Sequence, residues 1–288
     1  MFKGSYVAIV TPFKNGKLDL DKFRRLVEFH IENKTDGIVP CGCTGEAATL
    51  THSEQETLIK FCVEVANKRV PVVAGTGSNS TQEAMELTRI AKKAGCNGAL
   101  MITPYYNKPT PEGQYRHYLS VAKDVDIPIM LYNVPSRTGI SMLPETVARL
   151  SKIDNIVAIK EASGSLDQVS RILSLCDITV MSGDDSLTLP MMGVGAKGVV
   201  SVAANIIPGK MHELVSSYLS GKQHKAQEIH YEILKLCKAM FIETNPIPVK
   251  TALKFMRMLN GDLRLPLCEM VKANEERLKT VLKEYKLI

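Results

Sequence analysis

Hydrophobic and polar positions along the chain alternate between two periods. Residues 5–11 form a short apolar run that is typical of a buried strand, and the apolar residues between positions 20 and 31 then recur at helical spacing. The same pair of patterns repeats to residue 220. It predicts strands at 5–11, 37–41, 70–75, 98–102, 127–132, 156–160, 178–182 and 198–202, each followed by a helix, at 20–31, 54–67, 81–93, 111–123, 144–151, 166–175, 187–192 and 208–220. Eight strand–helix units in succession predict an α/β protein with a (β/α)₈ TIM barrel rather than an open doubly wound sheet.

The alternation ends after Gly221. Residues 223–288 contain no strand-like run and are typical of three helices, which break at residues 245–248 and 261–266. We therefore expect a catalytic barrel domain over residues 1–222 and a C-terminal helical domain over residues 223–288, with a role in packing or association. No Gly-x-Gly-x-x-Gly sequence follows the first predicted strand, so the signature of a dinucleotide-binding fold is absent.

Composition and charge exclude several classes of protein. The 288 residues are 45% apolar, which is enough for a large core, and the net charge of +6 is scattered among acidic residues. Without a basic block interleaved with aromatic residues, we expect no nucleic-acid partner. No apolar run approaches the roughly 18 residues of a membrane helix, and the N-terminal run is too short for a signal peptide, so a cytoplasmic protein without a membrane partner is expected. Seven cysteines without Cys-x-x-Cys spacing argue against a disulfide framework and against a metal site.

The run Ile156-Val-Ala-Ile-Lys160 carries the first candidate for chemistry. Side chains alternate along a strand, so Ile156, Ala158 and Lys160 are expected on one face and Glu161 on the other. Lys160 would then point inward at the carboxyl end of its strand, where barrel enzymes place their active sites. One interpretation is a lysine whose buried stem carries its ammonium to water or to an acid. The other is an amine that burial keeps neutral for attack on a carbonyl, although deprotonation costs about 4–5 kcal/mol at pH 7.

Hydroxyl groups gather at the other predicted strand ends. Tyr132 lies one strand–helix unit before Lys160, so the two should project from neighbouring strands. A phenol beside an amine suits imine chemistry, which needs a proton donor and acceptor, whereas the alternative is a tyrosine that only closes the barrel. The predicted strand ends are Thr11, Cys43-Thr44, Thr76, Tyr105-Tyr106, Tyr132, Lys160, Gly183-Asp184-Asp185 and Ser201.

Four motifs resemble those of the dihydrodipicolinate synthase family, in that family's order and over nearly the whole chain. They are Gly42-Cys-Thr-Gly-Glu46, Tyr132-Asn-Val-Pro-Ser-Arg-Thr-Gly139, Ile159-Lys-Glu-Ala-Ser163 and Asn245-Pro-Ile-Pro-Val-Lys250. The first is shared by the wider superfamily of pyruvate-dependent class I aldolases. The second is more specific, because Arg137 is not expected in the sialic-acid lyase branch.

The resemblance implies a lyase that condenses pyruvate with L-aspartate-4-semialdehyde through a Schiff base on Lys160, without a cofactor. Tyr132 would be the general acid and base, in a relay with Tyr106 from a neighbouring subunit and with Cys43, where the family usually carries threonine. The carboxylate of pyruvate would lie against Thr44 and the backbone near Val200, and that of the aldehyde against Arg137. Gly183 would also line the substrate site. A homotetramer, built as a dimer of dimers, is the expected assembly.

The resemblance also implies a second site, for L-lysine as an allosteric effector. Its residues would be Ala48, His52, Asn79, Glu83 and Tyr105, whereas Ala47 and Gln55 depart from lysine-sensitive relatives. Local structure offers another explanation, since Thr51-His-Ser-Glu54 and Ser80-Thr-Gln-Glu83 are capping-box sequences. Two other functions stay open: another pyruvate-dependent 2-oxo-acid aldolase, and a catalytically silent lysine-binding paralogue.

Overall fold

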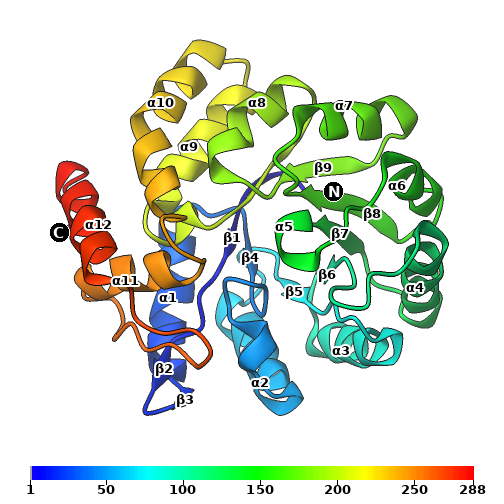
Figure 1. Ribbon diagram of the computed structural model, residues 1–288, viewed down its shortest axis with the longest axis horizontal. Helices are drawn as coiled ribbons and strands as arrows, with labels where there is room; N and C mark the ends of the chain where they lie inside the picture. The colour runs from blue at the N-terminus through cyan, green and yellow to red at the C-terminus, as the bar shows by residue number, and fades with distance from the viewer. Residues whose placement is uncertain (1) are drawn as a thin grey trace.

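A computed structural model describes residues 2–288 and shows a parallel β barrel surrounded by helices (Figure 1). The strands pair in the order β4-β1-β10-β9-β8-β7-β6-β5, and a bridge between Ile38 and Val72 joins the two ends of this sheet. The (β/α)₈ prediction is therefore confirmed. The described strands of the barrel are β1 (Gly4–Ala8), β4 (Gly37–Val39), β5 (Val73–Gly75), β6 (Gly98–Ile102), β7 (Ile129–Asn133), β8 (Ile156–Glu161), β9 (Thr179–Ser182) and β10 (Gly198–Ser201).

The helices that alternate with these strands cover the outside of the barrel. α2 starts at His52, because the Thr51 side chain accepts from the Glu54 N–H while the Glu54 carboxylate accepts from the Thr51 N–H, the predicted capping box. The outer helices are α1 (Leu20–Glu32), α2 (His52–Ala66), α3 (Thr81–Ala94), α4 (Pro111–Asp124), α6 (Pro144–Leu150), α7 (Leu166–Leu175), α8 (Thr188–Gly193) and α9 (Pro208–Leu219).

Short elements at the loops complete the barrel. A hairpin of β2 (Phe13–Lys14) and β3 (Lys17–Leu18) follows β1, and a helical turn, α5 (Pro135–Thr138), follows β7. Three single 3₁₀ turns are η1 (Ala47–Thr49), η2 (Asp185–Leu187) and η3 (Ala203–Asn205). All of the 3₁₀ turns and α5 directly follow strand ends or the loops after them, so they shape the mouth of the barrel.

A β-bulge in β8 changes which of its side chains face inward. Ile129 pairs with Ile156, but the next residue, Met130, pairs with Ala158, which leaves Val157 as an extra residue. Ile156 consequently packs in the layer between sheet and helices, while Val157 contacts the barrel interior. The prediction that Ile156 shares a face with Lys160 was therefore wrong, although Ala158 does lie in the interior.

Three helices follow the barrel, as predicted: α10 (Gln223–Ala239), α11 (Ile247–Phe255) and α12 (Lys272–Glu284). α10 packs along α9, and α12 packs on both α10 and α11. In Figure 1 these gold to red helices lie together on one side of the barrel. Across residues 2–288, every helix is too short or too polar to cross a membrane.

Candidate active site

Lys160 and Tyr132 lie side by side at the carboxyl end of the barrel. The two residues are register partners in the neighbouring strands β7 and β8, and the Lys160 Nζ lies 4.2 Å from the centroid of the Tyr132 ring. Both side chains are buried. The phenol and the amine therefore meet as the strand positions predicted.

Burial changes the protonation of both groups. It lowers the pKa of Lys160 to about 8, an effect that Cys43 and Asp185 oppose. Burial also raises the pKa of Tyr132 well above 10, and the nearby Cys43 thiol adds to this shift. The site thus combines an amine that is easily deprotonated with a phenol that keeps its proton.

Two buried carboxyl groups flank Lys160 without pairing with it. Glu161 points away from the amine, as predicted, and accepts hydrogen bonds from Asn133 Nδ2 and from the Ser163 N–H. Asp185 Oδ2 accepts from the N–H groups of Val202 (3.1 Å) and Ala203 (2.8 Å). Burial raises the pKa of Glu161, and it raises the pKa of Asp185 to about 6. Within residues 2–288, no three His, Cys, Asp or Glu side chains gather as a metal site requires.

The turn that carries Cys43 and Thr44 is anchored by a buried ion pair. Glu46 at its end adopts a left-handed conformation with a φ of 56°, and its Oε1 lies 2.5 Å from the Nζ of Lys250 in α11. The two side chains are 1% and 0% exposed, and Lys250 also donates to the Thr11 carbonyl. Removing one partner of such a pair costs about 3–5 kcal/mol. The C-terminal helices therefore help to hold a loop of the barrel mouth.

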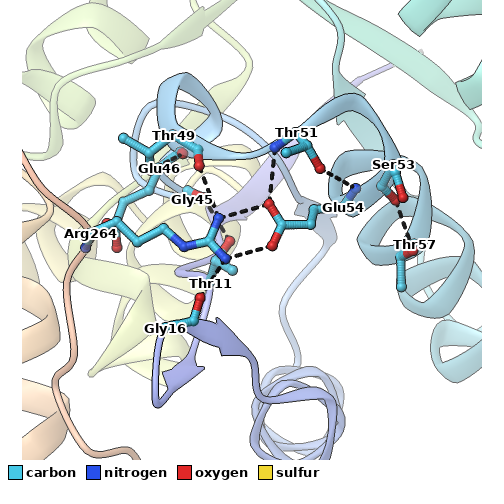
Figure 2. A network of polar contacts seen from close by, with 10 residues as sticks. All are labelled: Thr11, Gly16, Gly45, Glu46, Thr49, Thr51, Ser53, Glu54, Thr57 and Arg264. Carbon is cyan, nitrogen blue, oxygen red and sulfur yellow. Dashed lines mark hydrogen bonds and ion pairs between the residues drawn. The ribbon is translucent and has the colours of Figure 1, made fainter.

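A second anchor from the same C-terminal segment is Arg264, shown in Figure 2. Its guanidinium binds both carboxylate oxygens of Glu54, at 2.7 and 2.5 Å, and the carbonyls of Thr49 and Gly16. These hydrogen bonds lower the pKa of Glu54 to about 2. The Arg264 N–H also donates to Glu46 Oε2, so one residue joins α2, the β2–β3 hairpin and the Glu46 turn.

A cavity of about 380 Å³ opens above Lys160. Gly183 lines it, and a Cβ there would lie 3.0 Å from the Lys160 Cε, so a side chain would crowd the amine. Val200 is fully buried in the barrel interior, and Val202, two residues further along the chain, lines the cavity instead. The lining includes Thr44, Tyr132, Ser136, Arg137, Lys160, Gly183, Asp184, Glu243 and Asn245.

A second cavity, of about 360 Å³, adjoins the first, and Tyr132, Arg137 and Asn245 line both. Four of the five residues predicted for a lysine site line it: Ala48, His52, Glu83 and Tyr105. The fifth, Asn79, does not, and its carbonyl accepts from Asn107 Nδ2.

Glu83 is turned toward this second cavity rather than toward its own helix. The predicted capping box at Ser80 is only half formed: the Ser80 hydroxyl accepts from the Glu83 N–H, but the Ser80 N–H donates to the Ser78 hydroxyl. The Glu83 carboxylate binds the Ser78 hydroxyl and the His52 Nε2, the latter at 2.6 Å. These contacts, that of Ser78 first, lower the pKa of Glu83.

Tyr106 lies apart from both cavities. The residue is 89% exposed, and its backbone adopts a φ of 70°. Within one copy of the chain, Tyr106 therefore does not join Tyr132 and Cys43, the other residues predicted for the proton relay.

Comparison with known proteins agrees with this geometry. The model of the Dihydrodipicolinate synthetase family matches residues 1–285. The chain belongs to this family. A relative from Geobacter metallireducens, named 4-hydroxy-tetrahydrodipicolinate synthase, is 59% identical over 290 residues and the whole of both chains.

Solved structures of dihydrodipicolinate synthases have the same fold. The enzyme from Aquifex aeolicus is 50% identical over 99% of both chains, with a TM-score of 0.98. The enzyme from Acinetobacter baumannii, solved with pyruvate, is 44% identical over 100% of both chains, with a TM-score of 0.98. The enzyme from Cyanidioschyzon merolae, solved with lysine bound, is 40% identical over 100% of this chain and 99% of that one, with a TM-score of 0.96.

Proposed function

We propose that this chain is a lyase that condenses pyruvate with L-aspartate-4-semialdehyde to 4-hydroxy-tetrahydrodipicolinate, in the biosynthesis of diaminopimelate and lysine. The environment of Lys160 carries the proposal: its amine is buried against a phenol, in a cavity that also contains one guanidinium. The full-length identity to 4-hydroxy-tetrahydrodipicolinate synthases supports the choice of reaction.

The first half of the reaction uses Lys160 as the nucleophile. Its neutral amine attacks the carbonyl carbon of pyruvate, and Tyr132 shuttles the protons needed to expel water and form the imine. Thr44 holds the carboxylate of pyruvate beside the amine. The imine is itself the electron sink for loss of a methyl proton, so the resulting enamine forms without a cofactor.

The second half joins the aldehyde and releases the lysine. The enamine carbon attacks the aldehyde carbon, whose oxygen takes a proton. The amino group of the semialdehyde then attacks the imine carbon and displaces the Lys160 amine. Arg137 binds the carboxylate of the semialdehyde, because a guanidinium offers a bidentate, charge-assisted contact.

The exposure of Tyr106 supports an assembly in which a neighbouring copy completes the relay. A phenol that is 89% exposed in one chain is free to enter the site of another. We propose a dimer that exchanges Tyr106 and pairs into a tetramer. Sedimentation analysis measures the oligomeric state directly. Tyr106→Phe should lower turnover without changing the oligomeric state. The cytoplasmic location expected from the sequence stays a prediction.

A coupled assay with both substrates tests the function, and mapping of the imine tests the mechanism. Borohydride added with pyruvate should leave a stable adduct on the peptide that contains Lys160, and none in a Lys160→Met variant. An adduct on another lysine would overturn the mechanism. Turnover of other aldehydes in preference to aspartate semialdehyde would instead favour a different pyruvate-dependent aldolase, and binding of lysine without any turnover would favour the silent paralogue.

L-Lysine is the proposed effector of the second cavity. The His52–Glu83 contact and Tyr105 lie at its wall, and a carboxylate such as that of Glu83 suits an ammonium group. Calorimetry should detect binding of millimolar L-lysine, and Glu83→Ala should weaken it. If L-lysine inhibits Glu83→Ala as strongly as it inhibits the parent, the effector binds elsewhere and this site is wrong.

A further inference from the structure

Asn245 lies where the two cavities meet and contacts a group on either side. It is 5% exposed, and its side-chain Nδ2 donates a hydrogen bond to the Thr44 Oγ1 at 3.1 Å. Its main-chain carbonyl accepts from the Arg137 guanidinium at 2.8 Å. One residue after the barrel is therefore bonded to both groups proposed to bind substrate carboxylates.

The side-chain contact restricts the hydrogen bonds that the Thr44 hydroxyl can make. A hydroxyl has one donor and two acceptor lone pairs. Because Asn245 fills a lone pair of Thr44, the O–H stays available, and in residues 2–288 no protein acceptor takes it. Thr44 lines the cavity above Lys160, and a carboxylate accepts hydrogen bonds but donates none.

We propose that Asn245 is a positioning residue for pyruvate, which turns the O–H of Thr44 toward the substrate carboxylate. This inference rests on the function proposed above. Asn245 acts through Thr44. Arg137, on the aldehyde side of the site, is bound by the main-chain carbonyl of Asn245, so its position does not depend on the Asn245 side chain.

Two observations support a placed, functional side chain. α11 begins directly after Asn245-Pro246, and the buried Lys250 of that helix is bonded to Glu46 in the same turn as Thr44. The Lys250–Glu46 contact therefore holds the segment that carries the Asn245 amide against the turn that carries the Thr44 hydroxyl. In addition, the Asn245 Oδ1 is buried without a partner in the described chain. Leaving a buried acceptor unsatisfied costs about 1–3 kcal/mol, and such groups recur at functional sites.

Two substitutions of Asn245 separate orientation from packing. Asn245→Ala removes the donor and leaves the main-chain bond to Arg137 intact, so KM for pyruvate should rise about 3–10-fold, the worth of one hydrogen bond. KM for the aldehyde should stay within about twofold for the same reason. Asn245→Asp keeps the shape but offers only acceptors, so Thr44 should turn toward it and pyruvate should bind at least about tenfold more weakly than in the Ala variant.

A packing role gives the opposite order, because the isosteric Asp variant should then be milder than the Ala variant. A double-mutant cycle with Thr44→Val adds a second measure. In that background Asn245→Ala should change KM for pyruvate by less than about twofold, since the hydroxyl to be oriented is gone. Additive losses, or an Asp variant milder than Ala, would overturn the inference.

Borohydride trapping on each folded protein shows which proposal fails. The fraction of Lys160 modified is measured against pyruvate concentration in the parent and in both Asn245 variants, after thermal unfolding has confirmed folding. A parent without an adduct overturns the proposed function and this inference with it. An adduct with the same pyruvate dependence in parent and variants overturns this inference alone. If Asn245→Ala does not fold, Asn245→Asp decides the question, and a pyruvate dependence equal to that of the parent overturns the inference.

Discussion

The pKa of Lys160 predicts a specific pH dependence. Burial lowers it from 10.5 to about 8. At pH 7 about one amine in ten is then neutral, compared with about one in 3,000 at the unperturbed pKa, and the difference corresponds to about 3 kcal/mol. Only the neutral amine attacks pyruvate, so the protein raises the reactive fraction by a factor of roughly 300.

The assay is the pH profile of kcat/KM for pyruvate, which reports groups of the free enzyme. We expect a rise of about tenfold per pH unit from pH 6, an inflection near pH 8 and a plateau above it. Asp185→Asn should move the inflection down, because the Asp185 carboxylate raises the pKa of Lys160. A profile that keeps rising to pH 10, or that is flat from pH 6, would refute a buried amine of this kind.

The same lowering of its pKa means that Lys160 decreases the free energy of unfolding. Its pKa is lower in the folded protein than in the unfolded chain, so the unfolded chain binds more protons between about pH 8 and 10.5. Its destabilisation is therefore complete below pH 8 and disappears as the pH rises to 10.5. Lys160→Met should raise the free energy of unfolding at pH 7, and this gain should shrink toward pH 10.5. A variant that is less stable than the parent at pH 7 would contradict the burial of a charged amine.

Three further predictions concern residues around the same site. Arg137→Ala should abolish most of the turnover with aspartate semialdehyde, because a charge-assisted pair is lost. Trapping of the pyruvate imine should stay at the parent level. Equal loss of turnover and trapping would refute the assignment of Arg137 to the aldehyde carboxylate. Cys43→Thr should raise turnover by roughly 2–12-fold, because a hydroxyl forms stronger hydrogen bonds than a thiol, and Cys43→Ala should lower turnover little. If Cys43→Thr is slower than the parent and Cys43→Ala is nearly inactive, the thiol itself works in the relay. Lys250→Met should lower the free energy of unfolding in guanidinium by about 3–5 kcal/mol, and adding Glu46→Met should restore most of it; a single variant as stable as the parent would refute the buried pair.

The order of strands and helices and the pairing of Tyr132 with Lys160 could be predicted from the sequence, because both follow from periodicity and from the common edge of parallel strands. The bulge at Val157 could not, since it depends on how β8 pairs with β7 and leaves no mark in composition. The β2–β3 hairpin was missed although Asn15-Gly16, both with positive φ, is a strong hairpin signal.

The contacts of the C-terminal segment with the barrel mouth could not be predicted from the sequence either. Asn245 and Lys250 were part of a recognised motif, but their proline-rich surroundings indicated only a helix break. Their partners Thr44 and Glu46 lie 201 and 204 residues away, and no periodic pattern links positions so far apart. Conversely, the sequence at Ser80 predicted a complete capping box, and tertiary contacts with His52 and Ser78 drew Glu83 away from it.

The ion pair between Glu46 and Lys250 also bears on the order in which the molecule matures. Glu46 leaves the ribosome 204 residues before Lys250 does, and all barrel strands are synthesised by Ser201. A buried carboxylate is strongly disfavoured without its cation, so we expect the turn that carries Thr44 to stay unanchored until α11 has been made. A chain truncated after α9 should therefore retain all eight barrel strands but bind pyruvate poorly.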